Sequence, residues 1–256
     1  MLFLFNELVY RPIYNLLIFT YNIFPVADFG IAIVLVTIFI KLLLIPLSKK
    51  QIESQKKMQA LQPKIKEIQA KYKGDKEKQS RALMEFYKEN KTNPFSGCLP
   101  TIFQLIFLIA IYRVLFNISG SGNGLVVDGS GLYSFVSNPG QINQFFLGIV
   151  DLGKSIDFKN ITLASLPHIV LVVLAAASQY FQTKMLMAKQ AKKGVKMDSS
   201  DFSAVMSQQM LYLGPLLTLF IGIKFSAGLA LYWLISTVFM VAQQYYLENQ
   251  EKVAVK

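Results

Sequence analysis

A single lysine, Lys41, stands inside an apolar run that extends from Phe29 to Leu47. With its flanks this run is long enough to cross a bilayer, because roughly 20 apolar residues span about 30 Å. A charge in such a segment costs about 2.5–3.5 kcal/mol on insertion scales, and charged residues found there usually face protein or water and mark functional sites. The chemistry open to Lys41 is electrostatic, since its ammonium group would lower the cost of moving a carboxylate into the membrane.

Polar side chains occur at the same depth in the other apolar runs, which lie near 98–116, 161–183, 205–223 and 227–247. Each run carries amides or hydroxyls toward the end that adjoins basic loops, whereas the opposite ends are mostly apolar. We expect a hydrophilic groove open on the basic side, formed by Lys41, Thr37, Gln104, Gln179, Gln182, Gln208 and Ser236. Two simpler interpretations stay open. Such residues also join membrane helices by hydrogen bonds, and Lys41 lies only about 9 Å from the end of its run, which its side chain could nearly span.

The sequence lacks residues that catalysis or transport usually requires. The sequence has no paired carboxylates, metal-ligand cluster or phosphate-binding glycine loop at a membrane boundary, so we expect neither an enzyme nor a cofactor. His168 is the only histidine and has no evident partner, and the single Cys98 cannot form an intramolecular disulfide. No acidic residue lies within an apolar run to relay protons, and no filter-like loop is found. A small-solute or ion transporter or channel remains the alternative function.

The distribution of charge places the apolar runs in a membrane and orients them. The chain is 53% hydrophobic with net charge +11, and its basic residues fall mainly in two blocks, 49–92 and 184–196. Loops rich in Lys and Arg face the cytoplasm. We therefore predict an all-α integral membrane protein with five transmembrane helices, its N-terminus outside and its C-terminus inside. Residues 28–48 and 93–247 form its membrane core, and residues 248–256 form a short tail.

The block 49–92 has the pattern of a helical hairpin. Apolar positions from Met58 to Tyr72 are spaced alternately by three and four residues, and a second series follows from Gln79. This narrow seam is typical of a coiled-coil-like antiparallel pair, with Gly74 in the turn. We expect a cytoplasmic recruitment surface near anionic lipid headgroups, formed by Lys64, Lys66, Lys71 and Lys73. The simpler interpretation is a solvated basic loop that only sets topology.

The N-terminal segment 1–27 is aromatic and aliphatic but interrupted by polar residues. We interpret it as an interfacial amphipathic helix, from Pro12 to Phe24, that lies on the outer face of the membrane. A sixth span is the competing interpretation. The segment has no small-residue cleavage site of the kind that ends a signal peptide. Further along, the Gly- and Ser-rich residues 119–131 are expected to form a flexible external linker.

Four stretches of the chain together resemble the sequence signatures of a known protein family. They are residues 40–47 (IKLLLIPL), 62–72 (QPKIKEIQAKY), 93–104 (NPFSGCLPTIFQ) and, after Pro215, 225–233 (FSAGLALYW). In this order they resemble the signatures of the YidC-type membrane protein insertases of bacteria, mitochondria and chloroplasts. The resemblance implies a multi-pass insertase and chaperone of the bacterial plasma membrane that acts without nucleotide hydrolysis.

The resemblance also implies a mechanism and partners. A polar segment of a nascent membrane protein would enter the cytoplasm-facing groove, while its apolar segment contacts spans three and five and passes into lipid. Nascent membrane proteins and anionic lipids are the implied partners, with the ribosome and a Sec-type translocon as further candidates and no direct role for nucleic acid. The family usually has arginine in the groove, whereas Lys41 keeps the charge without the bidentate fork. Neither the long basic tail of some members nor the large external domain of many others is expected here.

Overall fold

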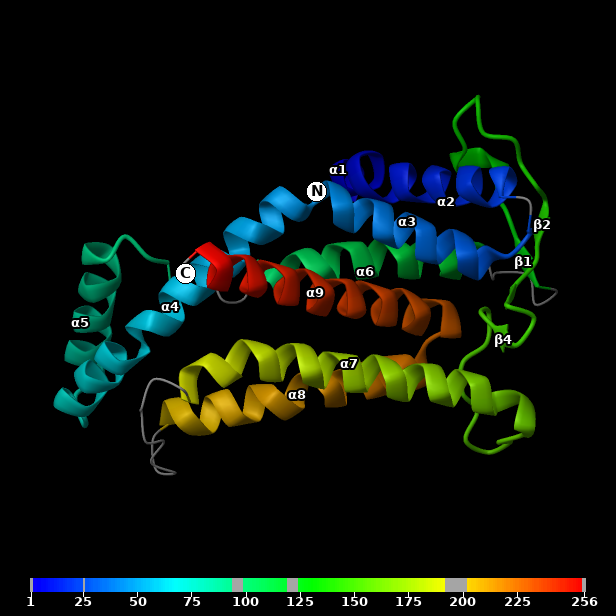
Figure 1. Ribbon diagram of the computed structural model, residues 1–256. Coiled ribbons are helices and arrows are strands. Elements are labelled where there is room, and N and C mark those ends of the chain that lie inside the picture. Colours follow the sequence, from blue (N-terminus) through cyan, green and yellow to red (C-terminus); the bar gives the residue numbers. More distant parts are fainter. Residues whose placement is uncertain (1, 25, 94–98, 119–123, 192–201, 255–256) are drawn as a thin grey trace.

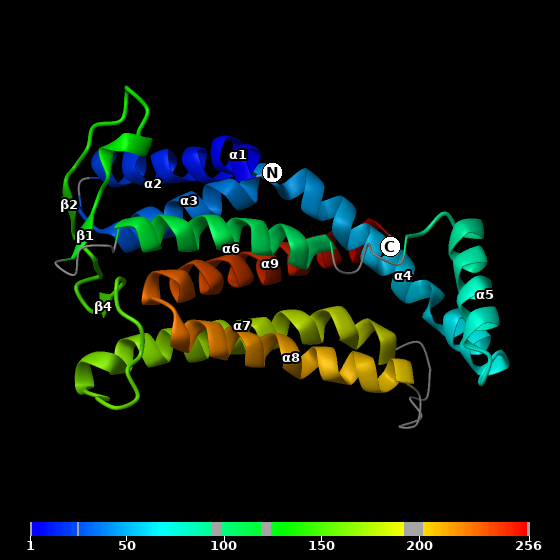
Figure 2. The ribbon, with the colours of Figure 1, turned by 180° about the vertical axis from the view of Figure 1, so that it is seen from behind.

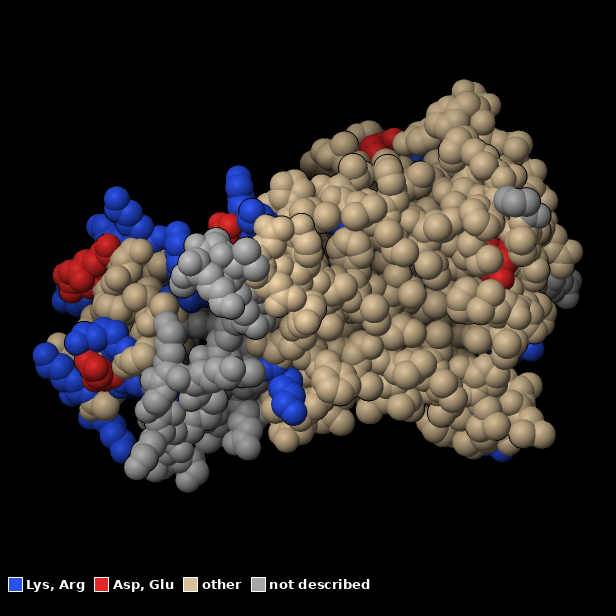
Figure 3. Space-filling view, viewed as in Figure 1, with Lys and Arg blue, Asp and Glu red and all other residues tan. Residues whose placement is uncertain are grey.

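Long helices form a bundle that is covered by short strands at one end and extended by a helical hairpin at the other (Figures 1 and 2). The computed structural model describes residues 2–24, 26–93, 99–118, 124–191 and 202–254. The chain is mostly helical, as predicted for an all-α membrane protein. In the space-filling view the visible face of the bundle is almost free of charged residues, and basic residues gather over the hairpin (Figure 3).

The helices of the bundle lie where the spans were predicted. Their bounds are α3 Phe29–Leu43, α6 Leu99–Ile118, α7 Leu166–Ala191, α8 Phe202–Lys224 and α9 Ala227–Ala254. Among the described residues, two stretches can cross a membrane by length and composition, Leu163–Met185 and Ala227–Leu247. A third candidate is the bent pair of α3 and the start of the next helix, and Ile102–Ile118 and Leu211–Lys224 are shorter apolar helices. The topology with five spans stays a prediction.

Helix α9 lies at the centre of the bundle, with α3 and α6 on one side and α7 and α8 on the other (Figure 1). The close packing of α7 on α8 requires Gly222, because a Cβ atom there would come within 2.8 Å of Val172. Beside it, Nε2 of His168 on α7 donates to the Gly222 carbonyl at 3.1 Å. The sequence offered no partner for His168, since its acceptor is a backbone oxygen that a side-chain pattern does not reveal.

Helix α3 ends at Leu43, and α4 (Ile45–Lys71) leaves it at an angle of 63°. Pro46 stands in the first turn of α4, where its missing N–H leaves no intrahelical bond unmade. An uninterrupted helix would have lost a hydrogen bond at that proline. The predicted first span is therefore broken before its end, and Lys41 lies in the last turn of α3.

Helices α4 and α5 (Lys76–Glu89) lie antiparallel beyond the bundle (Figure 1). Ile65 is the one buried apolar side chain of their seam among the described residues. Across the seam Gln79 Nε2 donates to a backbone carbonyl of α4 at 2.8 Å. Gly74, with φ at +104°, forms the turn. Proline usually kinks or ends a helix, but α4 continues through Pro63.

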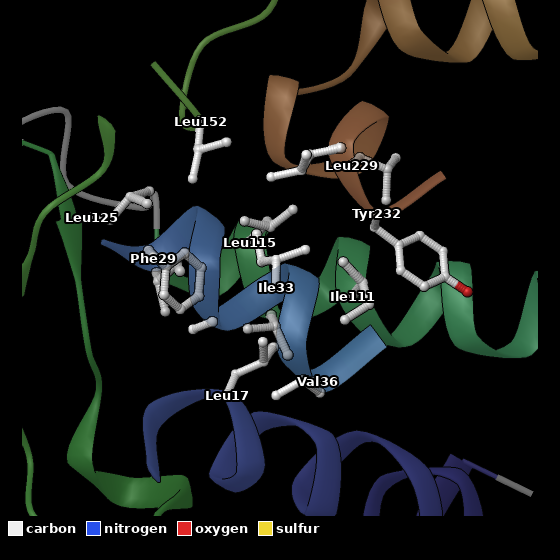
Figure 4. Packing of buried hydrophobic residues seen from close by; sticks show 14 of the residues in the cluster. Leu17, Phe29, Ile33, Val36, Ile111, Leu115, Leu125, Leu152, Leu229 and Tyr232 are labelled. Atoms are coloured by element: carbon white, nitrogen blue, oxygen red, sulfur yellow. The ribbon is translucent and has the colours of Figure 1, made fainter. Parts of the chain in front are cut away.

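The residues between α6 and α7 cover the end of the bundle opposite the hairpin, and we call residues 124–165 the cap. Its elements are β1 Leu125–Val126, η3 Gly129–Gly131, β2 Gln141–Ile142, β3 Phe145–Phe146, β4 Val150–Asp151 and η4 Leu163–Ser165. Strand β1 pairs antiparallel with β2, and β3 with β4. Leu125 and Leu152 are buried in the same cluster as Phe29 (Figure 4). The expectation of a flexible linker over 119–131 is wrong for its described part, because that part contributes to the core.

Asp28 fixes the capped end of α3. Its Oδ1 accepts from the N–H groups of Gly30 and Ile31 at 2.8 and 3.1 Å, which caps the helix. Its Oδ2 accepts from the N–H of Leu147 in the cap at 2.7 Å. Next to it Gly30 lies so close to the Phe146 ring that there is no room for a Cβ atom. A carboxylate that is only 4% exposed is thereby satisfied, and α3 is tied to the cap.

The N-terminal segment forms one helical stretch that runs lengthwise along α3 and α6 (Figures 1 and 2). It consists of α1 Leu2–Phe5, the π-helical turn η1 Asn6–Tyr10 and α2 Arg11–Ile23. Its buried side packs against the bundle through Ile13, Tyr14, Leu17, Ile18 and Tyr21. The opposite side is also apolar and exposed, with Phe3, Leu4, Leu8, Phe19 and Ile23. The helical stretch begins at Leu2, ahead of the expected start at Pro12, and its location on the membrane surface stays a prediction.

Several polar residues of this segment are paired with other parts of the protein. Asn15 Nδ2 donates to the Gly131 carbonyl at 3.0 Å, and Asn22 Nδ2 donates to the Ser137 carbonyl at 2.7 Å. Arg113 of α6 donates to Asn6 Oδ1 at 2.6 Å. The same guanidinium lies 4.9 Å from the ring centre of Tyr10 and 5.8 Å from that of Phe5. These contacts satisfy a cation that an apolar helix would otherwise expose.

We predict that Arg113 and the N-terminal helix stabilise each other. Replacing Phe5, Asn6 and Tyr10 together by leucine should lower the melting temperature of the detergent-solubilised protein by about 4–8 °C, which corresponds to about 2 kcal/mol for a chain of this size. Adding Arg113→Leu should restore most of that loss, because no unpaired cation then remains. The matched control is Phe3→Leu with Leu4→Ala on the exposed side, which should shift the melting temperature by less than about 1 °C. Fully additive effects would contradict this coupling.

Candidate functional site

Three helices meet at the side-chain amide of Gln104. Lys41 Nζ on α3 donates to Gln104 Oε1 at 3.0 Å, and Ser236 Oγ on α9 donates to the same oxygen at 2.9 Å. Gln104 itself lies on α6, five residues beyond its start at Leu99. The ammonium group of Lys41 therefore turns toward neighbouring helices, whereas the simpler interpretation had it extend to the membrane surface.

A cavity of about 50 Å³ adjoins this cluster on the side of the hairpin. That volume can hold at least one water molecule. Its lining residues are Lys41, Leu44, Leu47, Ser48, Gln51, Phe103, Gln104, Phe107, Met240 and Gln243. At its rim Gln243 Nε2 on α9 donates to Ser48 Oγ on α4 at 2.6 Å. The opposite side of Lys41 is mostly apolar, with Ile40, Phe107, Ile111 and Tyr232. Both sides are therefore largely apolar, and the side toward the hairpin carries the polar side chains of Ser48, Gln51 and Gln243.

The charge of Lys41 is not cancelled within the described part of the chain. Its hydrogen-bond acceptor is a neutral amide, and no ion pair to a described carboxylate forms. An amide oxygen lowers the cost of burying an ammonium group but leaves its net charge in place. The site can therefore attract an anion from the hairpin side.

Of the remaining predicted groove residues, Gln179 and Gln182 lie on another side of α9, whereas Thr37 lines an apolar pocket next to Lys41. On α7, Gln179 Oε1 accepts from Trp233 Nε1 at 3.2 Å, and Gln182 Nε2 contacts Met240 Sδ at 3.3 Å. Both glutamines therefore face α9 from the side of α7, whereas Lys41 faces it from the side of α3. Thr37 is buried, and its hydroxyl donates to its own helix at the Ile33 carbonyl at 2.6 Å. The side chain of Gln208 on α8 lies outside the described residues, as does Cys98.

Sequence reasoning missed the contribution of Met240 and the bond between Gln243 and Ser48. A signal existed, because Ser236, Met240 and Gln243 are spaced by four and three residues and so share one face of α9. The spacing does not reveal that Gln243 pairs with Ser48 on α4. Helical spacing shows which residues share a face, and it does not show which face of another helix lies opposite.

The lysines of the expected recruitment surface differ in their surroundings. Lys64 pairs with Glu67 at 2.7 Å, and both side chains are largely exposed. Lys71 Nζ lies 5.5 Å from the ring centre of Tyr72, Lys66 is half-buried, and Lys73 is exposed. An exposed pair contributes about 0–1 kcal/mol, so the lysines remain available to an anionic partner.

The fold and this site define a helical membrane protein with an uncancelled cation between its helices. The family model described as 60Kd inner membrane protein matches residues 19–254, and the chain belongs to this family. It is similar to the membrane protein insertase YidC of Fusobacterium nucleatum, with 33% identity over 223 residues that cover 87% of each chain. It is also similar to membrane protein insertase YidC 2 of Bacillus anthracis, with 30% identity over 257 residues that cover 99% of this chain and 84% of the relative.

Other curated relatives are longer than this chain. The YidC of Streptomyces avermitilis is 33% identical over 234 residues, and that of Geobacter sp. strain M21 is 32% identical over 222 residues. The chain spans 50% and 34% of their lengths. The family likeness inferred from the sequence is confirmed, and the protein is one of the bacterial cell membrane.

We predict that the cavity beside Lys41 is reached by water from the hairpin side alone. In a background with Cys98→Ser, a cysteine at Ser48 should react with a membrane-impermeant maleimide in inside-out vesicles and resist it in right-side-out vesicles. A cysteine at Thr37 should react at least about tenfold more slowly, because Thr37 is 2% exposed. Labelling rates measured by mass shift test this. Equal labelling of the Ser48 position from both sides would instead indicate a channel.

Proposed function

We propose that this chain inserts membrane proteins into the bacterial cell membrane and acts as their chaperone. A polar segment of the client enters the hydrophilic space beside Lys41 from the cytoplasm, and its apolar segment leaves into lipid. The observation that carries the proposal is the ammonium group of Lys41, held by Gln104 inside the bundle with no described carboxylate to cancel its charge. The relatives named as membrane protein insertases support the same reading.

The function of Lys41 in this proposal is to reduce the cost of desolvating a client carboxylate. A lone carboxylate in an apolar medium is strongly disfavoured, and a nearby opposite charge with hydrogen-bond donors offsets part of that cost. The client's apolar residues then gain about 25 cal/mol per Å² of surface removed from water. No nucleotide hydrolysis is needed, because apolar transfer and the membrane potential drive the step.

The apolar part of the client requires a lipid-facing path next to the polar site. Helix α7 presents a stripe of exposed apolar side chains, with Leu166, Val170, Val173, Leu174 and Phe181. On α9, Val238 is also exposed, two residues from Ser236 at the polar site. Because α9 contacts both α3 and α7, a client can keep polar residues near Lys41 and apolar residues on the outside.

The first test of the proposal changes the charge of Lys41. Lys41→Arg should retain insertion of a single-span client with an acidic translocated segment, and Lys41→Glu should abolish it, because the carboxylates would repel. Lys41→Ala should reduce insertion of the acidic client about tenfold and that of a neutral counterpart less than about threefold. Insertion is scored as protease protection in proteoliposomes with matched protein amounts.

Lys224→Glu is the control for this series, because it makes the same charge change at the exposed outer end of α8. It should leave insertion within about twofold of the unchanged protein. Equal insertion of the acidic client by the unchanged protein and Lys41→Glu would reject the electrostatic function of Lys41.

We also propose that the hairpin recruits clients in the cytoplasm through Lys64, Lys66, Lys71 and Lys73. Changing the four to glutamine should weaken cross-linking of an acidic client about fivefold, with a larger effect at low salt, where screening is weak. The control variant changes Lys154, Lys159 and Lys224 at the capped end, and it should cross-link normally. Undiminished cross-linking in the hairpin variant would make the hairpin a topological spacer.

A further inference from the structure

The hairpin formed by β3 and β4 in the cap is apolar on both of its faces. Its residues 145–150 read FFLGIV. Phe146 packs against the start of α3 and Val150 is buried, so these two side chains face the bundle. The exposed side chains are Phe145 at 43%, Leu147 at 62% and Ile149 at 62%. A hairpin with protein on one face and water on the other alternates apolar and polar residues, and this hairpin does not.

The turn of this hairpin holds a leucine in a conformation that leucine rarely adopts. Leu147 and Gly148 at its centre have φ angles of +52° and +70°, and the N–H of Ile149 donates to the Phe146 carbonyl at 3.0 Å. A two-residue turn of this kind favours Asn, Asp or Gly at its first position, because a left-handed backbone brings a Cβ atom too close to the carbonyl oxygen. The chain thus tolerates strain while it presents a large apolar side chain at the tip.

The loop between α2 and α3 lies beside this hairpin and is also apolar. Asn143 Nδ2, just before β3, donates to the Ala27 carbonyl at 2.7 Å, and the N–H of Phe29 donates to the Asn143 carbonyl at 3.3 Å. The exposed side chains of this loop are Ile23 at 64%, Phe24 at 39% and Val26 at 57%. We call these three side chains, together with Phe145, Leu147 and Ile149, the apolar rim.

Charge is absent from the apolar rim, and the rim continues onto the bundle. Its two segments, residues 23–27 and 143–150, contain no Asp, Glu, Lys or Arg. Asp28 between them and α3 is only 4% exposed. Further along α3 the exposed side chains are again apolar, as at Leu35 and Phe39. The rim is therefore an extension of the surface that a membrane helix turns toward lipid.

The backbone of the hairpin is suited to an environment without water. The N–H of Phe145 donates to Asn143 Oδ1 at 3.1 Å, and the N–H of Leu147 donates to Asp28 Oδ2 at 2.7 Å. The N–H of Ile149 is bonded across the turn. All three residues that point outward thus have their N–H groups satisfied within the protein. Hydrocarbon requires this of any backbone that it contacts, because it offers no hydrogen-bond partners.

We propose that the apolar rim inserts into the hydrocarbon of the leaflet on the cap side. The basic hairpin at the opposite end makes this the outer leaflet. A lipid occupant fits better than a protein, because protein interfaces are bordered by polar residues that pair across them. The amides next to the rim are already used within the protein, since Asn143 bonds to Ala27 and Gln144 Nε2 donates to Asp151 at 3.0 Å.

Insertion of the rim would fix the depth of α3, and the inference does not depend on the proposed function. Lys41 follows Asp28 by thirteen residues, which is about 20 Å along a helix. With the rim just inside a hydrocarbon core about 30 Å thick, Lys41 would lie about 10 Å from the opposite boundary.

Nitroxide labels on single cysteines test the proposal, in the Cys98→Ser background and in proteoliposomes of phosphatidylethanolamine and phosphatidylglycerol. The rim sites are Val26, Leu147 and Ile149, and the matched control is Lys159, an exposed position of the cap. Electron paramagnetic resonance compares collisions with oxygen, which concentrates in lipid, and with a polar nickel chelate, which stays in water. The ratio of oxygen to nickel collisions should be at least about fivefold higher at each rim site than at Lys159.

The labelled proteins should melt within about 2 °C of the Cys98→Ser background, because the substituted side chains are exposed. If Leu147→Cys disturbs the turn, Val26 and Ile149 still report on the two segments. Nickel access at the rim sites equal to that at Lys159 would place the rim in water and overturn the inference. Shielding from both reagents would show that protein covers the rim, either a second copy or another chain, and would also overturn it. Lipid contact at Val26 without contact at Ile149 would exclude the hairpin from the membrane and overturn it as well.

Discussion

An ammonium group buried in an apolar bundle must find acceptors, and this requirement organises the centre of the protein. Lys41 finds its acceptor on another helix, at Gln104, and Ser236 of a third helix shares it. Helix α9 supplies Ser236 and packs against α3 and α6 on this side. Its other side packs against α7 and α8. The acceptor is neutral, so the bundle accommodates the cation without removing its charge. Burying the ammonium group requires an acceptor, whereas the proposed function requires an uncancelled charge, and a neutral amide satisfies both requirements.

Helix α9 connects the polar interior with the rest of the bundle. Ser236 faces Gln104, whereas Trp233, three residues earlier, faces Gln179 on α7. Met240 lines the cavity beside Lys41 and also contacts Gln182 of α7. A shift of α7 would therefore move α9 side chains that line the cavity, through these contacts. The two groups of polar residues, which the sequence placed in one groove, lie on two sides of the same helix.

The sequence was sufficient to predict the helical class and the positions of the long helices, because these follow from hydropathy and spacing. It could not identify which amide binds Lys41, since five runs offered amides or hydroxyls at one depth. It also could not reveal hydrogen bonds from side chains to the backbone of distant segments. Asn15 and Asn22 are examples, because their acceptors are carbonyls of the cap. The glycines of residues 119–131 suggested a flexible segment, although Leu125 is buried in the core.

The link between Asp28 and the cap has a mechanical consequence. Because Asp28 ties the start of α3 to the cap, α3 can separate from its neighbours only by rotating about that end. The gap between the helices would then be widest at the end far from the cap. With arms of about 30 Å, admitting a helix about 10 Å across would require a swing of about 20°. An extended strand needs only about 5 Å, and hence about half that swing. Under the proposed function, this fastening would favour a client segment that enters as a single extended strand over one that enters as a helix.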